Sequence, residues 1–130
     1  MQRTIVNPWQ WQDAFGFVQG HEVQGTPRVL FCAGQAAVSA EGQLLHPGDM
    51  RAQTQQAFDN LETVLQAGGY TLGDVARLVY YTTDMEALLA NWDVIVQRVG
   101  QGEVKPASTL LGVTALAFGA LVEIEATAVK

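Results

Sequence analysis

The feature that most constrains the fold is an amphipathic segment that begins after Asp49 and ends at Gly68 and Gly69. Its apolar positions recur every three or four residues, and this spacing places them on one face of an α-helix. Asp49 can cap the first turn, and the two glycines end the helix. The predicted buried face consists of Met50, Thr54, Ala57, Phe58, Leu61, Val64 and Leu65. A helix with one apolar face requires a second layer that covers it.

A second helix of the same kind is predicted from about Asp84 to Val99. Thr83 and Glu86 have the spacing of a capping box, and Gly100 follows the last apolar position as a stop signal. Its apolar positions are Met85, Leu88, Leu89, Trp92, Ile95, Val96 and Val99. Both helices are therefore apolar on one side only, which is typical of helices that pack on one face of a sheet.

Four segments, residues 28–33, 74–82, 107–116 and 121–129, have the β-branched and aromatic composition of strands. The earlier segment 14–20 is a candidate partner for the first of them. One predicted helix follows each of the first two strands. The chain is therefore expected to form an α/β fold of the two-layer α+β type, whose mixed, mostly antiparallel sheet carries two helices on one face.

The composition indicates one globular domain, residues 1–130, with a small molecule as its partner. The length lies within the usual single-domain range, and no linker or repeat interrupts the chain. The net charge of −6 and the seven scattered basic residues argue against a nucleic-acid interface, which needs clustered Lys and Arg. No stretch is long and apolar enough for a membrane span, and the N-terminus lacks the apolar core of a secretory signal, so a cytoplasmic location is expected.

The single cysteine and the two histidines are predicted to be structural. Cys32 lies in an apolar run, so a buried strand cysteine is favoured over a reactive thiol, and no intrachain disulfide can form. His21 and His46 lie in polar, turn-like contexts with no Cys or carboxylate at metal-ligand spacing. We therefore interpret both as surface residues and expect no metal site.

The last predicted strand indicates how the helix-free face of the sheet is used. Alternation places Val122, Ile124, Ala126 and Ala128 on one face, and Leu121, Glu123, Glu125, Thr127 and Val129 on the other. Two carboxylates on a partly apolar strand face either point to solvent or line a polar site between subunits, and the pattern alone favours solvent. The segment from Ser108 to Glu125 is the best candidate for a small-molecule site.

Four short motifs occur in order along nearly the whole chain: Val18 to Gly20, Ala33 to Gln35, Gln53 to Leu61, and Gly119 to Ala126. In this combination the sequence resembles the RidA family of reactive enamine and imine deaminases, also called the YjgF-type or endoribonuclease L-PSP family. The run Val-Glu-Ile-Glu-Ala, which ends the fourth motif, carries the most specific part of the resemblance.

The resemblance implies a chorismate-mutase-like fold and a homotrimer, in which the helix-free sheet faces form a central barrel and three pockets lie between subunits. It also implies hydrolysis of an enamine or imine, such as 2-aminoacrylate, to a 2-keto acid and ammonia. The family uses neither a metal nor a cofactor for this reaction.

Three family site residues have counterparts in this sequence. The family glutamate that positions the attacking water corresponds to Glu123, and a carboxylate in that position can act as a general base. Gly34 corresponds to a glycine that allows close backbone approach to the ligand. Asn91 corresponds to a family asparagine only after an offset of one residue.

Two other family site residues are replaced. The substrate-anchoring arginine follows Pro-Ala in the family, and here Pro106 and Ala107 are followed by Ser108. A serine hydroxyl offers one neutral donor where arginine offers two charge-assisted hydrogen bonds to a carboxylate. A family tyrosine corresponds to Phe17, which lacks the hydroxyl. Both replacements make the implied pocket more apolar, and Lys105 is too far along the strand to compensate.

Three functions are therefore weighed. The retained Glu123 favours a divergent enamine or imine deaminase whose substrate lacks a carboxylate at the usual place. The changes at Ser108 and Phe17 favour a trimeric metabolite-binding or regulatory protein without catalysis. Ribonuclease activity is disfavoured by the acidic charge balance. If a cation replaces the missing arginine, Arg77 or Arg3 of a neighbouring subunit is a candidate.

Overall fold

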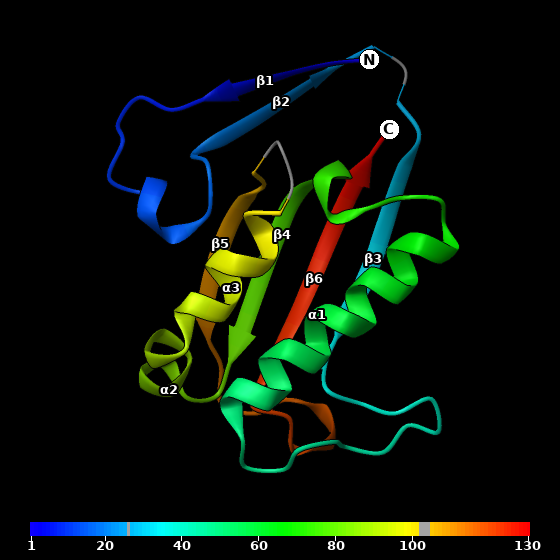
Figure 1. The fold of residues 1–130 in the computed structure, drawn as a ribbon, viewed down its shortest axis with the longest axis vertical. Coiled ribbons are helices and arrows are strands. Elements are labelled where there is room, and N and C mark those ends of the chain that lie inside the picture. Colours follow the sequence, from blue (N-terminus) through cyan, green and yellow to red (C-terminus); the bar gives the residue numbers. More distant parts are fainter. Residues whose placement is uncertain (26, 102–104) are drawn as a thin grey trace.

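A four-stranded mixed sheet forms one layer of the protein, and helices cover one of its faces (Figure 1). The computed structural model describes residues 1–25, 27–101 and 105–130. The sheet order is β3-β6-β4-β5, and these strands are β3 (Val29–Gln35), β6 (Val122–Val129), β4 (Val75–Thr82) and β5 (Ala107–Gly112). Strand β6 is antiparallel to both neighbours, whereas β4 and β5 are parallel. The predicted two-layer α+β fold is confirmed.

The first helix, α1 (Met50–Ala67), matches the prediction closely. The Asp49 side chain accepts a hydrogen bond from the backbone N–H of Ala52 at 3.0 Å, which satisfies one of the free donors of the first turn. At its other end the backbone N–H of Gly68 bonds to carbonyls of the last turn. Helix α1 lies across β6 and β3, in front of the sheet in Figure 1.

The predicted second helix is interrupted. It consists of α2 (Met85–Ala90) and α3 (Trp92–Val99), with Asn91 between them at a φ of −114°. The Asn91 side chain donates a hydrogen bond to the carbonyl of Ala87 at 2.8 Å, so it competes with the backbone for that acceptor. The N-cap of α2 is Asp84, which accepts from the N–H of Ala87, and not the predicted Thr83.

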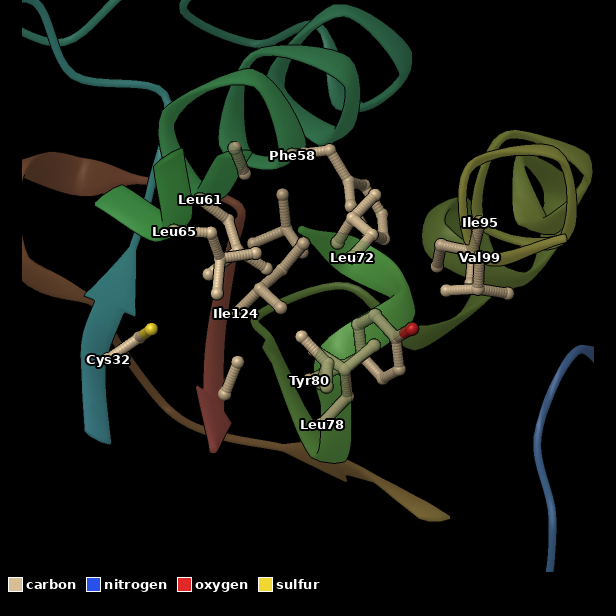
Figure 2. Close-up of a cluster of buried hydrophobic side chains, with 14 of the residues drawn as sticks. Cys32, Phe58, Leu61, Leu65, Leu72, Leu78, Tyr80, Ile95, Val99 and Ile124 are labelled. Carbon is tan, nitrogen blue, oxygen red and sulfur yellow. The ribbon is translucent and has the colours of Figure 1, made fainter. Parts of the chain in front are cut away.

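The core lies between the helices and the sheet, as Figure 2 shows. Phe58, Leu61 and Leu65 of α1 point toward the strands, and Ile95 and Val99 of α3 extend the cluster. The predicted inward face of the last strand is confirmed, because Val122, Ile124, Ala126 and Ala128 are all buried in this cluster. Leu121 was expected on the opposite face, but β6 begins only at Val122 and Leu121 packs against the core.

Cys32 is buried at the edge of the same cluster, as predicted, and burial raises the pKa of its thiol. A buried thiol with a raised pKa carries little thiolate near neutral pH. The structure therefore supports a packing role for this cysteine.

The N-terminal region differs from the prediction. Strands β1 (Gln2–Val6) and β2 (Gly20–Gln24) form a separate two-stranded antiparallel sheet, and segment 14–20 does not pair with β3. The segment cannot run as a strand because it contains a 3-10 helix that ends at Gly16, where φ is +82°. Instead, Val18 bridges to Ala107 at the free edge of β5.

Strand β5 ends earlier than predicted, at Gly112. Its partner β4 ends at the paired residue Thr82, so no strand remains beyond this point to continue the ladder. The following loop contains a short 3-10 helix, Ala117–Gly119, in which Phe118 has a φ of +64°. No helix in the described part of the chain is long and apolar enough to cross a membrane.

Candidate functional site

Glu123 and Gly34 lie in contact where β3 bends away from a regular ladder with β6. Cys32 pairs with Ala126 and Gln35 with Ile124, so two residues of β3 lie opposite one residue of β6. This is a β-bulge, a feature that commonly redirects side chains near functional sites. Glu123 lies on the helix-free face of β6, and its side chain extends toward the bulge.

Gly34 cannot be replaced without moving that carboxylate. A Cβ atom at Gly34 would lie 2.9 Å from Cγ and 2.8 Å from Cδ of Glu123, and it would overlap Oε1. The absence of a side chain at this position therefore makes room for the Glu123 carboxylate. In this structure the group that lies close to Gly34 is the protein's own glutamate, and the close approach of a ligand to this glycine stays a prediction.

The two residues line a cavity of about 280 Å³ near the end of the sheet. Ser39, Asn60 and Phe118 also border it, and the Phe118 ring is 61% exposed. Among the described residues, no hydrogen bond or ion pair engages the Glu123 carboxylate. Its oxygens are therefore available to accept hydrogen bonds from a water molecule or a ligand.

Asn60 was not predicted as a site residue, although it belongs to one of the motifs. Its side-chain amide donates to the carbonyls of Ala36 at 2.8 Å and Val38 at 2.9 Å, and it thereby holds the loop that borders the cavity. A polar residue beside the apolar helix positions Ala57 and Leu61 is the sequence signal that could have identified it.

Phe17 and Ser108 lie together in a second cavity, of about 230 Å³, at the β5 edge of the sheet. Its aromatic walls are Trp11, Phe15, Phe17 and Trp92, and β5 contributes Leu110 and Ser108. The Trp11 and Phe17 rings meet edge to face, with centroids 5.7 Å apart. Among the described residues, no charged side chain belongs to the lining.

Within one subunit these two cavities are separate. Ser108 pairs with Leu78, whose side chain is buried on the helix side of the sheet, whereas Glu123 pairs with Tyr81 on the helix-free side. The structure thus brings Glu123 to Gly34 and Phe17 to Ser108, but it does not bring the two pairs into one pocket of a single chain.

Asn91 lines neither cavity. Its amide nitrogen is bonded to the carbonyl of Ala87, and its oxygen accepts from Arg51 at 3.4 Å. These contacts account for its presence at the junction of α2 and α3. Its assignment to the ligand site stays a prediction.

The helix-free face carries a third, open cavity of about 500 Å³, which the sequence did not predict. Here the Tyr81 hydroxyl donates to Glu125 at 2.5 Å, and this hydrogen bond to the carboxylate raises the pKa of Tyr81. Arg77 donates to the Thr109 hydroxyl at 2.8 Å. The period-two alternation of residues 74–82 is the signal that could have placed Tyr81 and Arg77 on one face.

The two histidines differ from each other. His46 is exposed, as predicted, but His21 is half-buried and accepts a hydrogen bond from Arg3 Nε at 2.9 Å. Arg3 also donates to the carbonyl of Gly73 at 2.9 Å, so its guanidinium is already engaged. No group of three His, Cys, Asp or Glu side chains that could hold a metal ion occurs among the described residues.

Comparison with known proteins supports the architecture. The endoribonuclease L-PSP family model matches residues 13–130. A RutC family protein of Pyrococcus horikoshii is 36% identical over 101 residues, which cover 78% of this chain and 79% of that protein. A mouse 2-iminobutanoate/2-iminopropanoate deaminase is 31% identical over 103 residues, or 79% of this chain and 75% of the mouse protein.

A solved structure is similar over almost the full length. The crystal structure of a Rid family protein of unknown function from Yersinia pestis covers 98% of both chains, with 38% identity and a TM-score of 0.87.

Fold and site together define a small α+β protein with a carboxylate-bearing cavity at a β-bulge. The chain belongs to the endoribonuclease L-PSP family, the YjgF, RutC and Rid group of proteins. The predicted membership is confirmed.

Proposed function

We propose that this protein is a small-molecule hydrolase that removes ammonia from an enamine, imine or related metabolite, with Glu123 as the catalytic base. The observation that carries the proposal is the Glu123 carboxylate, which lies against Gly34 in a cavity and has no hydrogen-bond partner among the described residues. The deaminase name of the mouse relative supports the same reaction class.

The chemistry requires one water molecule and one proton shuttle. An enamine first tautomerises to the imine. Glu123 then accepts a proton from water as the water oxygen attacks the carbon of the C=N bond, the electron pair of that bond moves to nitrogen, and Glu123 returns the proton to this nitrogen. In the resulting carbinolamine, Glu123 transfers the hydroxyl proton to nitrogen, the C–N bond breaks to release ammonia, and the oxygen forms the carbonyl group. A positioned general base typically contributes about 10²–10⁴-fold to such a step.

We further propose that the working pocket forms between subunits of a homotrimer. The Glu123–Gly34 cavity of one subunit and the Phe17–Ser108 cavity of the next would then supply its two halves. Large apolar side chains on the helix-free face support such assembly, because Phe31 is 79% exposed and Leu111 is 44% exposed. Exposed apolar groups on one face commonly mark an interface.

The test is the rate of keto-acid release from 2-aminoacrylate that a coupled dehydratase generates. We expect Glu123→Gln to lower the rate of enzymatic keto-acid release at least 100-fold, because the glutamine amide cannot accept the proton from the attacking water. Glu125→Gln is the matched control from the same strand face, and we expect it to stay within a few-fold of wild type. Equal activity in wild type and Glu123→Gln would exclude Glu123 as the base.

Because Ser108 replaces the arginine that anchors the substrate carboxylate in the family, we expect the wild type to bind 2-aminoacrylate weakly. Ser108 cannot hold the 2-aminoacrylate carboxylate as an arginine would, since it offers one neutral donor. We expect Ser108→Arg to lower the KM for 2-aminoacrylate at least tenfold while Glu123 remains essential. A KM unchanged by this substitution would show that Ser108 does not face the substrate carboxylate.

The second candidate function is a trimeric metabolite-binding or regulatory protein without catalysis. The apolar Phe17–Ser108 cavity favours it, because Ser108 lacks the charge of the family arginine and Phe17 lacks the hydroxyl of the family tyrosine. Failure of wild type and Ser108→Arg to accelerate hydrolysis of any enamine or imine would favour this function over the first.

A further inference from the structure

The Phe17–Ser108 cavity has the size and chemistry of a ring-binding site. Four of its lining residues are aromatic, and contacts of Trp92 hold part of this arrangement. Trp92 Nε1 donates to the carbonyl of Phe15 at 3.0 Å, and the Trp92 ring meets that of Tyr80 with centroids 5.4 Å apart. The indole N–H is therefore already used, and the Trp92 ring presents an apolar surface.

The cavity size suits one ring with a short substituent. Its volume is about 230 Å³. A dry, apolar protein cavity of about 150 Å³ is large enough to bind benzene. Edge-to-face contacts such as the one between Trp11 and Phe17 also favour an aromatic guest, because ring edges and faces attract each other.

The electrostatics of the cavity disfavour an anionic guest. No charged side chain lines it in the part of the chain that the structure describes, and the Lys105 ammonium donates to the carbonyl of Asp13 at 3.4 Å. A carboxylate moved from water into this apolar cavity would lose hydration without gaining a charged partner.

Ser108 supplies the hydroxyl group of the described lining. Among the described residues, no hydrogen bond engages the Ser108 hydroxyl, so it can bond to a neutral donor or acceptor on the guest. A neutral imine or amide nitrogen adjacent to the ring meets this requirement. A peptide segment fits less well, because its successive backbone amides would face aromatic walls without partners.

We propose that the Phe17–Ser108 cavity binds an uncharged aromatic group, so that the preferred substrates are neutral imines or enamines that carry an aryl ring. This inference rests on the proposed function, since it assigns the substrate class of the same pocket. The aryl ring occupies the aromatic walls, and Ser108 bonds to the neutral polar group next to it.

The test uses three probes that do not react: phenylacetamide, phenylacetate and propanamide. The first two share the ring and differ in charge, and the third lacks the ring. In isothermal titration calorimetry with the full-length protein, we expect phenylacetamide to bind at least tenfold tighter than either of the others. Equal or tighter binding of phenylacetate or propanamide, or no binding of phenylacetamide, would overturn the proposal.

Variants locate the binding site. Trp11→Ala is expected to weaken phenylacetamide binding at least fivefold, whereas Trp9→Ala should leave it unchanged, because Trp9 is a similarly exposed tryptophan outside the cavity lining. Ser108→Arg should reverse the preference, so that phenylacetate binds more tightly than phenylacetamide. Equal effects of the two tryptophan substitutions would place the ring elsewhere and contradict the assignment.

The inference and the proposed function can fail separately. If phenylacetamide binds but no imine is hydrolysed, the proposed hydrolase activity is excluded and the aryl ligand class of the cavity is retained. Efficient hydrolysis of 2-aminoacrylate with no preference for aryl imines would keep the hydrolase and overturn the aryl substrate class.

Discussion

At the scale of single residues, the site depends on one missing side chain. Gly34 leaves the space that the Glu123 carboxylate fills, and any Cβ there would collide with three atoms of that side chain. The requirement is steric, since Gly34 is not among the glycines with positive φ. Alanine is therefore compatible with the backbone and incompatible with the position of the carboxylate.

We predict that Gly34→Ala lowers activity by about 10–100-fold, as expected when a general base is displaced but not removed. In urea unfolding, the same substitution should destabilise the wild type by about 1–3 kcal/mol, the usual cost of overpacking. In a Glu123→Ala background, which removes the colliding atoms, Gly34→Ala should cause little further loss of unfolding free energy. Equal destabilisation in both backgrounds would show that Gly34 is required for another reason.

At the scale of elements, the N-terminal hairpin is attached to the sheet through Arg3 and His21. Arg3 of β1 donates to His21 of β2 and to the carbonyls of Gly73 and Val75 at the start of β4. Burial, and then the charge of Arg3, lower the pKa of His21. A protonated His21 could no longer accept the hydrogen bond from Arg3.

We predict that stability falls as pH decreases below the ordinary histidine pKa of about 6.5. Because the folded state has the lower His21 pKa, the unfolded chain binds the proton more readily in this range, and protonation favours unfolding. Above that pH the histidine is neutral in both states and has no effect. The free energy of unfolding in urea at pH 7.5 and pH 5.5 measures the difference.

The matched variants for that measurement are His21→Gln and His46→Gln. His21→Gln should reduce the loss of stability between the two pH values, since glutamine can accept the bond from Arg3 but does not titrate. His46 is exposed, so its replacement should leave the loss unchanged. A pH dependence that is equal in wild type and His21→Gln would contradict this role of His21.

At the scale of the whole molecule, the helix-free face of the sheet exposes large apolar side chains. Phe31 is 79% exposed there, beside Arg77 and the Tyr81–Glu125 pair. An exposed aromatic side chain on an open sheet face is costly in a monomer and is expected to be covered by a neighbouring subunit. In the proposed trimer, each of the three subunits would bury its helix-free face around a common axis.

We predict that the wild type sediments as a trimer of the 14.0 kDa chain. Phe31→Glu should dissociate it, because the substitution removes an apolar ring from the interface and adds a carboxylate to a face that already carries Glu125. Thr63→Glu adds the same charge on the exposed side of α1 and should leave the mass unchanged. A monomeric wild type would exclude a pocket built between subunits.

Much of the architecture follows from local patterns that the sequence displays directly. The spacing of Phe58, Leu61 and Leu65 predicts a one-sided helix, and the alternation of Val122 and Ile124 predicts which face of the last strand is buried. These patterns are reliable because apolar burial acts on every residue of an element in the same way.

The sequence by itself determined the fold class, the buried faces of the first helix and the last strand, and the family, because these depend on periodicity and on short motifs. The predicted face of the second helix was wrong in part, since Leu89 is exposed and Val94 is buried. Only the tertiary structure decided where the site residues meet. The bulge that brings Gly34 to Glu123, and the bridge from Val18 to Ala107 beside Phe17 and Ser108, arise from pairing between distant segments. Such pairing depends on which strand ends and edges are free in space, and the local sequence does not encode that information.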